Sequence, residues 1–420
     1  MRILFCLSAC LLFCVNLPAQ LPQLTAADPA SPIYLSTLSI DVRVIGNRAT
    51  TTFTMAFHNP SKRVLEGQFA FPLPEGAYVT RYALDVAGKM REGVPVEKVR
   101  ATQVFEAIEK RQVDPGLLEK TEGANFRTRI YPVPAGGERR VIVGFEQELP
   151  VIKSGELVYQ LPLEAKEVLR TLSINVTVLQ QGPSPLLDAI PFGSLAFIPS
   201  SEGYTARAQG ENVRLKGALA FRIPKNSSRP EVFVQKGDGR HTFYVHTALS
   251  GPAKEKVLPK SVAVIWDNSL SGLYRDTASE LQLLKNYLTE CRNTTVLLYS
   301  LHNRFRAEGE YAIREGNTKA LLQKIRSLPY DGGTDYGRIR LPKVEEVLFF
   351  SDGVSTLSDS PFPAAPCPVY AISGSSRANH GTLRSIAQSN GGVFINLKNT
   401  APDEAMVSQR SQSFFFLGVK

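Results

Sequence analysis

The first part of the chain alternates apolar and polar residues with a period of two. The alternation is clear at residues 38–44 and 52–57, and residues 68–71, 81–86 and 139–147 are also expected to be strands. A period of two places every second side chain on one face, so these segments are expected to be strands with one buried face. A helix is expected to interrupt them at 98–110, where apolar residues recur with helical spacing.

Residues 156–257 carry no strong helical period. Their apolar runs, residues 171–179, 213–221, 231–235 and 241–247, are bounded by clusters of glycine, proline and serine. Such punctuation is typical of an all-β region. We therefore expect a β-rich linking domain over 151–258, after a β-rich, sandwich-type domain over 30–150.

The pattern changes after Lys260, where apolar runs alternate with helices. The expected strands are residues 261–266, 294–301, 344–350, 368–372 and 393–397. The expected helices are residues 276–290, one capped by Asn317, and a short one near 383–387. Apolar strands separated by helices predict an α/β fold, with a doubly wound, mostly parallel sheet covered on both faces. We expect this Rossmann-like domain to span 259–400.

Oxygen-bearing residues follow two of these strands and fill one loop between them. Asp267-Asn268-Ser269-Leu270-Ser271 follows the strand at 261–266, and Ser351-Asp352-Gly353 follows the strand at 344–350. Gly332-Gly333-Thr334-Asp335 lies between the two along the chain. In open α/β sheets, ligands bind beyond the carboxyl ends of the strands. We therefore expect the three fragments to meet.

The candidate metal ligands in these fragments are Asp267, Ser269, Ser271, Thr334 and Asp352. Residues two apart in an extended loop point the same way, which would aim the Asp-x-Ser-x-Ser side chains at one ion. Two glycines before the threonine let the backbone turn tightly there. Two carboxylates, three hydroxyls and water suit an octahedral Mg²⁺ or Mn²⁺ ion. The plainer alternative is that these residues only cap helices and fill turns.

The N-terminus has the pattern of a signal peptide over residues 1–19. Arg2 precedes an apolar run over 3–15, and Leu17-Pro18-Ala19 predicts cleavage before Gln20. A competing pattern, Leu7-Ser8-Ala9-Cys10, resembles a bacterial lipobox. No later run has the length of a transmembrane helix, so we expect an extracytoplasmic chain without a transmembrane span.

Composition limits the function without assigning one. The chain has 420 residues, of which 43% are hydrophobic and 21% charged, as is typical of a globular protein with more than one domain. The net charge is +9, but the basic residues are spread along the chain without interleaved aromatics. Nucleic acid is therefore not an expected partner.

Cysteine and histidine add no further site. Outside the signal peptide only Cys291 and Cys367 remain, and each precedes a strand that is not expected to neighbour the other, which predicts two free, buried thiols. His241 and His246 share an expected strand, but their odd spacing turns them to opposite faces. Neither a nucleophile-elbow pattern nor a His-Glu-x-x-His motif is present, so the chain is not expected to be an enzyme.

Residues from about 260 to 400 resemble a von Willebrand factor A domain with an intact metal-ion-dependent adhesion site, carried by the three oxygen-rich fragments. The resemblance implies that Ser269, Ser271 and Thr334 bind the ion directly. It implies that Asp267 and Asp352 act mainly through water. It also implies that a carboxylate from a protein partner completes the ion's coordination.

The N-terminal part resembles the vault protein inter-alpha-trypsin domain. The matching stretches are residues 101–108, 115–119 and 126–134, completed by the strand at 139–145. The two domains in this order resemble the inter-alpha-trypsin inhibitor heavy chains and their bacterial relatives. Residues 401–420 form an expected C-terminal segment with an apolar ending that fits an interrupted strand, so the sequence is either complete or a piece of a longer protein.

The expected function follows from the metal site and from export. It is that of a metal-dependent binding or adhesion protein. Its expected partners are a protein that offers an acidic side chain and components of the envelope or the extracellular matrix. The alternative is a structural or assembly scaffold of the cell envelope in which the metal is incidental, because fold alone does not fix function.

Overall fold

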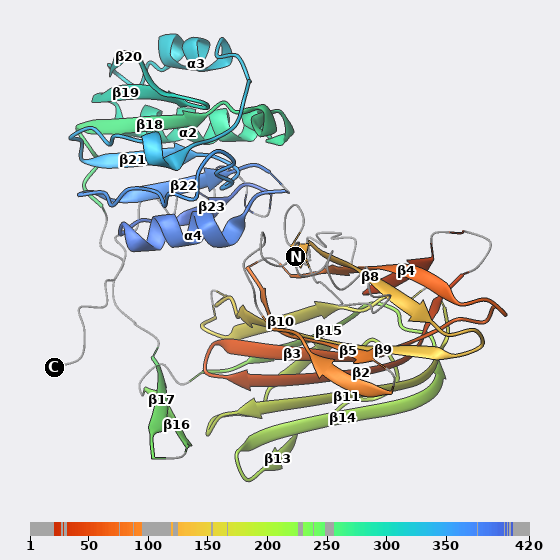
Figure 1. The fold of residues 1–420 in the computed structure, drawn as a ribbon. Coiled ribbons are helices and arrows are strands. Elements are labelled where there is room, and N and C mark those ends of the chain that lie inside the picture. Colours follow the sequence, from red (N-terminus) through yellow and green to blue (C-terminus); the bar gives the residue numbers. More distant parts are fainter. Residues whose placement is uncertain are drawn as a thin grey trace, which may run out of the picture. The chain divides into compact units, whose positions relative to one another are not determined.

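The computed structural model describes residues 21–94, 119–120, 125–247 and 256–398, with 400, 402 and 405, and leaves out 27, 29–31, 75, 87, 153, 166, 226–229, 238 and 376 within these ranges. The chain forms two compact units (Figure 1). Of the described residues, the first unit holds those within 1–72, 79–119 and 127–247, and the second holds those within 73–78, 120–126 and 248–420. The expected signal peptide, the helix at 98–110, the matching stretches 101–108 and 115–118, and nearly all of 401–420 lie outside the described residues.

An eight-stranded sheet forms the centre of the first unit, in the order β13-β14-β11-β2-β3-β9-β5-β6. Its strands are β2 (Tyr34–Ile45), β3 (Arg48–His58), β5 (Tyr78–Val86), β6 (Lys89–Glu92), β9 (Glu138–Glu148), β11 (Leu169–Leu179), β13 (Ile198–Ser200) and β14 (Gly203–Val213). β2 and β11 pair in parallel. Segments 30–150 and 151–258 therefore share one sheet, where the sequence led us to expect successive domains.

Two smaller sheets cover one face of this sheet. One contains β1 (Gln23–Ala26), β4 (Leu65–Pro72), β8 (Asn125–Val133) and β7 (Glu119–Lys120); the other contains β10 (Leu157–Pro162), β15 (Ala218–Ile223) and β12 (Leu186–Ala189). Phe57 of β3 packs edge-on against Phe69 of β4, with ring centroids 5.9 Å apart. Thr51, on the same face of β3, shares a 2.9 Å hydrogen bond with Tyr159 of β10. The predicted β-rich N-terminal half is confirmed, and it is layered.

The prediction of one strand in this unit was wrong. The apolar run at 213–221 is divided, because β14 ends at Val213 and β15 begins at Ala218. Gly217 between them has a φ of +105°, a conformation that favours glycine and turns the chain. β16 (Glu231–Lys236) and β17 (His241–His246) pair as a separate two-stranded hairpin, as the sequence predicted for both strands.

The second unit contains a six-stranded sheet in the order β20-β19-β18-β21-β22-β23. Its strands are β18 (Ser261–Asp267), β19 (Thr294–Leu301), β20 (Phe305–Ile313), β21 (Glu346–Phe350), β22 (Val369–Ser373) and β23 (Phe394–Asn396). Only β20 runs antiparallel to its neighbour. The predicted α/β unit with a mostly parallel sheet is confirmed. β20 was not predicted, because an edge strand with exposed charged residues lacks an apolar run.

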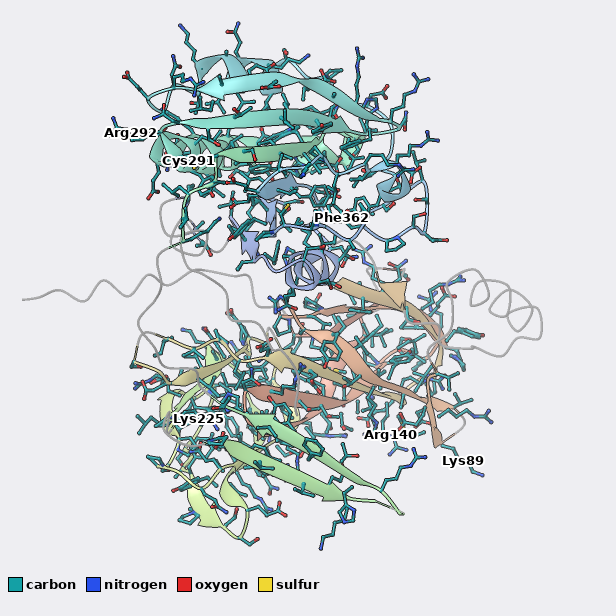
Figure 2. The ribbon with its side chains drawn as sticks, turned by 90° about the vertical axis from the view of Figure 1, so that its left-hand side faces the viewer. Lys89, Arg140, Lys225, Cys291, Arg292 and Phe362 are labelled. Atoms are coloured by element: carbon teal, nitrogen blue, oxygen red, sulfur yellow. The ribbon has the colours of Figure 1, made fainter. Side chains whose placement is uncertain are left out.

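Helices cover both faces of this sheet, as β18 makes clear. Val262, Val264 and Trp266 face a core shared with α2 (Thr277–Cys291) and α3 (Lys319–Arg326). Ala263 and Ile265 point the other way, into a core shared with α4 (His380–Ser389). Figure 1 shows α4 beside β22 and β23, and in Figure 2 side chains fill the spaces on both sides of the sheet. Alternation along a strand that is buried on both faces produces this doubly wound architecture.

The ends of the helices depart slightly from expectation. Thr318, rather than Asn317, is the N-cap residue of α3. The Asn317 side chain still accepts a hydrogen bond from the Lys319 amide at 3.1 Å, so it satisfies one of the free amides at the helix start. Cys291 ends α2 beside Arg292, both labelled in Figure 2.

Candidate functional site

The first loop of the candidate site begins where β18 ends, at Asp267. The chain enters a short 3-10 helix, η1 (Leu270–Tyr274), and then α2, whose N-cap Asp276 accepts a hydrogen bond from the Ser279 amide at 3.1 Å. Gly272 allows this tight path, because a Cβ atom there would lie 2.5 Å from the Tyr330 ring. The loop thus turns back over the end of β18 instead of extending away from it.

The five predicted ligands come together at the carboxyl edge of the sheet. The Thr334 hydroxyl donates to Asp267, with 3.3 Å to each carboxylate oxygen. The Ser269 and Ser271 hydroxyl oxygens lie 3.1 Å apart. The Ser271 side chain also forms a hydrogen bond with the Asp352 carboxylate. All five residues are buried except Ser271, which is half-buried.

Two glycines hold Thr334 in the second loop. Gly332 has a φ of +66°, and a Cβ atom on it would lie 2.3 Å from the side chain of Asn303. A Cβ atom on Gly333 would lie 2.4 Å from the Thr356 hydroxyl. That hydroxyl accepts a hydrogen bond from the Thr334 amide at 3.0 Å, so the glycine leaves room for the group that positions Thr334. The sequence predicted a tight turn of the backbone at these glycines, and the positive φ of Gly332 agrees with it.

Asp352 begins the third loop, after β21. The Val354 amide donates to its carboxylate at 3.0 Å. Burial raises the pKa of Asp352, and the negative charge of Asp267 raises it further. Hydrogen bonds from Ser271 and Val354 act in the opposite direction without reversing the shift. Two close, poorly hydrated carboxylates favour the approach of a cation.

Ser351 belongs to the site, although the sequence did not single it out as a ligand. Its hydroxyl donates to Asp267 at 2.6 Å and accepts from the Gly353 amide at 3.0 Å. It therefore joins the first loop to the third and orients the Asp267 carboxylate. The only signal in the sequence was its place between the strand and Asp352.

A buried arginine next to these loops, Arg275, was also missed in the sequence analysis. Arg275 has no exposed side-chain surface, and its guanidinium lies 3.2 Å from the Glu280 carboxylate and 5.1 Å from the Trp266 ring. It donates to the Phe350 carbonyl at 3.0 Å. The Trp266 indole donates in turn to the Tyr330 hydroxyl, also at 3.0 Å. A charged residue just before a helix usually lies in solvent, so the sequence gave no reason to place Arg275 inside.

The donor set at this edge fits a hard divalent cation such as Mg²⁺. All its ligand atoms are oxygens, from two carboxylates and three hydroxyls, and such a set leaves positions for water. No three His, Cys, Asp or Glu side chains gather as a metal site anywhere in the described part of the chain. An ion at this edge would therefore depend on the hydroxyls of Ser269, Ser271 and Thr334.

The remaining candidate residues form no second site among those described. Cys291 and Cys367 are free thiols, the first buried and the second half-buried. They precede β19 and β22, which are not neighbours in the sheet, as predicted. His246 contacts Glu231 at 3.1 Å, while His241 at the other end of β17 is exposed. None of the helices in the described ranges combines the length and apolarity needed to cross a membrane.

Two solved structures are distantly similar to this chain. An aerotolerance-related membrane protein from Bacteroides fragilis is 14% identical, with 36% of this chain and 97% of that chain covered and a TM-score of 0.28. The conserved hypothetical protein BatB from Bacteroides thetaiotaomicron is 13% identical, with coverage of 36% and 95% and a TM-score of 0.28. Likenesses at this level carry no argument about function.

Sequence comparisons are more informative for the first unit. Residues 35–145 match the family model of the vault protein inter-alpha-trypsin domain. Inter alpha-trypsin inhibitor, heavy chain 4 of Mus musculus is 27% identical over 356 residues, which cover 80% of this chain and 37% of the relative. Inter-alpha-trypsin inhibitor heavy chain H4 of Homo sapiens is 22% identical over 267 residues, which cover 59% and 28%. The chain thus spans about a third of the length of these relatives.

The family match ends at residue 145, before the α/β part of the second unit, where the resemblance to a von Willebrand factor A domain remains a prediction. The matched range contains β3, β5 and β6 and most of β2 and β9, which are five consecutive strands of the eight-stranded sheet. Residues 35–145 are therefore similar to the vault protein inter-alpha-trypsin domain, and the chain is similar to the inter-alpha-trypsin inhibitor heavy chains.

Proposed function

We propose that the chain is an exported binding protein that captures a protein partner through a divalent cation, Mg²⁺ or Mn²⁺. The ligands would be Asp267, Ser269, Ser271, Thr334 and Asp352, as in a metal-ion-dependent adhesion site. One observation carries the proposal: these oxygen-bearing side chains, from three separate loops, converge at the carboxyl edge of a parallel sheet. That edge is where open α/β sheets bind ligands. The similarity to inter-alpha-trypsin inhibitor heavy chains supports protein binding.

The charges at the site suit capture of an acidic partner. A bound cation would supply an electrophilic centre for a carboxylate oxygen. The protein contributes only two carboxylates there, and the buried Arg275 offsets part of their charge. Neutral hydroxyls provide the other ligand atoms. Fewer negative charges around the ion mean less repulsion of an incoming carboxylate.

A structural scaffold is the second candidate function, favoured by one feature of the loops. Asp267 already accepts hydrogen bonds from the Ser269 amide and from the Thr334 and Ser351 hydroxyls. These bonds close the three loops together without an ion. In a scaffold the same contacts would serve stability, and partner binding would not depend on metal.

Capture experiments separate the two candidates. Envelope extract would be passed over the immobilised chain in Mg²⁺, in Mn²⁺ and in excess chelator. We expect a partner that is retained in either metal and lost in chelator, on Ser271→Ala and on Thr334→Ala. Ser385→Ala, an exposed hydroxyl on α4, is the matched control and should retain it. Equal capture under all conditions would favour the scaffold.

Export is tested independently of binding. The positive Arg2, the apolar run at 3–15 and the Ala19 cleavage pattern predict a mature N-terminus near Gln20. N-terminal sequencing of the protein from its native host should find that end. An intact Met1 would contradict export by this route, and a lipid on Cys10 would identify the competing lipobox.

A further inference from the structure

The metal loops carry an unusual number of exposed apolar side chains. Within residues 256–398, the exposed large apolar side chains are Val257, Leu270, Leu273, Tyr274, Val354 and Leu357. All but the first lie in the first and third loops of the candidate metal site. We call these five residues the apolar rim. Leu273 and Tyr274 are the most open of them, at 61% and 62% exposure.

Hydrogen bonds place the rim residues beside the candidate ligands. The Leu270 amide donates to the Gly332 carbonyl at 3.0 Å, so the first loop touches the second. The Leu357 amide donates to the Thr334 carbonyl at 3.0 Å. The Val354 amide donates to the Asp352 carboxylate, also at 3.0 Å. The backbone amide of each of these three apolar residues thus donates a hydrogen bond to a candidate ligand or to the loop that holds one.

In the first loop the polar side chains are buried or half-buried and the apolar side chains are exposed, which is the reverse of the pattern in an ordinary solvated turn. Ser269 is buried and Ser271 is half-buried, toward the cluster, whereas Leu270 and Leu273 are exposed. Of the residues from Ser269 to Tyr274, only the two serines are candidate ligands of the ion. Leaving large apolar side chains in water costs about 25 cal/mol per Å² of apolar surface. Clustered exposure of this kind marks a surface that meets another molecule.

A positive charge lies beside the apolar rim. The guanidinium of Arg377 lies 4.5 Å from the centre of the Tyr274 ring. Together with a bound cation it makes the centre and one side of the surface attractive to anions, while the surrounding side chains remain apolar. A highly charged, strongly hydrated partner would gain little binding free energy from contact with these apolar side chains.

We propose that the apolar rim and the metal site form one docking surface for a protein segment in which an Asp or Glu is flanked by large apolar side chains. The carboxylate occupies the centre, and its apolar neighbours cover Leu270, Leu273, Val354 and Leu357. This inference rests on the proposed function, and it adds the chemistry that surrounds the acidic residue.

A displayed peptide library tests the flanking chemistry directly. Its members carry a fixed central Asp, with random residues on both sides, and are selected on the full chain in Mn²⁺. We expect enrichment of leucine, isoleucine, phenylalanine or tyrosine beside the Asp, and loss of the selected peptides in chelator. Polar or unselective flanks would overturn the inference.

Rim variants supply the matched measurement, with one selected peptide as the probe. Leu273→Gln combined with Leu357→Gln should weaken peptide binding at least about tenfold, or about 1.4 kcal/mol, without changing the Kd for Mg²⁺. Val257→Gln is the control, because Val257 is 89% exposed and precedes the amino end of β18, away from the carboxyl-edge loops. Peptide binding unchanged by the double variant would overturn the inference.

Further measurements distinguish its failure from failure of the proposed function. If wild type binds no Mg²⁺ or Mn²⁺ in calorimetry, the proposed function fails. The rim inference then fails with it, because no ion is present to bind the partner's carboxylate. If the metal binds and the selected flanks are polar, only the rim inference fails. Metal-dependent self-association in sedimentation would identify a second copy as the occupant. Rim-dependent binding to vesicles of anionic lipid would identify a membrane. Either result would overturn the peptide assignment.

Discussion

The guanidinium of Arg275 and the carboxylate of Glu280 lie 3.2 Å apart, and neither side chain has any exposed surface. Burial alone would lower the pKa of Arg275, but the negative charges of Glu280 and Asp267 raise it. The Glu280 carboxylate also accepts from the Gly374 amide at 2.8 Å. The pair therefore links the start of α2 to the loop after β22, directly behind the candidate metal site.

Breaking this pair from one side should destabilise the second unit strongly. In Arg275→Met, Glu280 keeps a buried charge without its cation, which costs about 3–5 kcal/mol. Urea unfolding would measure the loss. The double variant Arg275→Met with Glu280→Met should recover a large part of it, because the uncompensated charge is gone. A single variant as stable as wild type would show that the guanidinium is not needed there.

A single methyl group on Gly333 should weaken metal binding without removing a ligand. In Gly333→Ala the new Cβ atom would collide with the Thr356 hydroxyl, which accepts from the Thr334 amide. Thr334 then loses its support, and we expect Mg²⁺ affinity to fall roughly tenfold, in the range seen when outer-shell partners of a metal site are removed. Gly381→Ala is the control, because its Cβ atom has ordinary room. Calorimetry on both variants decides, and equal affinities would contradict this role.

Lys256 and Glu346 predict a pH-dependent stability at the other end of the sheet. Burial raises the pKa of Glu346. Lys256 and Tyr287, which donate hydrogen bonds to its carboxylate, offset part of this rise. In Lys256→Met that pKa should rise further. A raised pKa favours the protonated form in the fold, so its contribution is present at low pH and lost as pH rises through the folded pKa. The variant should therefore be destabilised most at neutral pH, by about 3–5 kcal/mol, and least in acid.

Urea unfolding at several pH values measures this trend. Arg81→Met is the control, because Arg81 and Glu92 form an exposed pair that should contribute no more than about 1 kcal/mol at any pH. A Lys256→Met loss that is constant with pH would contradict the role assigned to Glu346.

The sequence predicted those parts of the fold whose signal is local. The strand at 294–301 is rich in apolar residues, and its predicted limits are those of β19. β20 escaped prediction, because its Arg, Glu and Gly residues lie at an exposed edge. The parallel pairing of β2 with β11 also escaped, since it joins residues more than a hundred positions apart and leaves no trace in either segment.

The site shows the same division. The spacing after a strand predicted Asp267, Ser269 and Ser271 as ligands, and the two preceding glycines helped to predict Thr334. Ser351, Arg275 and the exposed rim acquire their roles only from three-dimensional packing. Nothing in a pattern of polar and apolar residues distinguishes Leu273 facing solvent from a leucine in the core.

Titration of Mg²⁺ into wild type and Asp267→Asn by calorimetry tests the central claim most directly. Asparagine keeps the size of Asp267 and an oxygen for its hydrogen bonds, while removing the charge at the centre of the cluster. We predict that wild type binds one Mg²⁺ and is stabilised against heat by it, and that Asp267→Asn stays folded but binds no ion. Equal Mg²⁺ affinity in the two proteins, or no binding by either, would contradict the account.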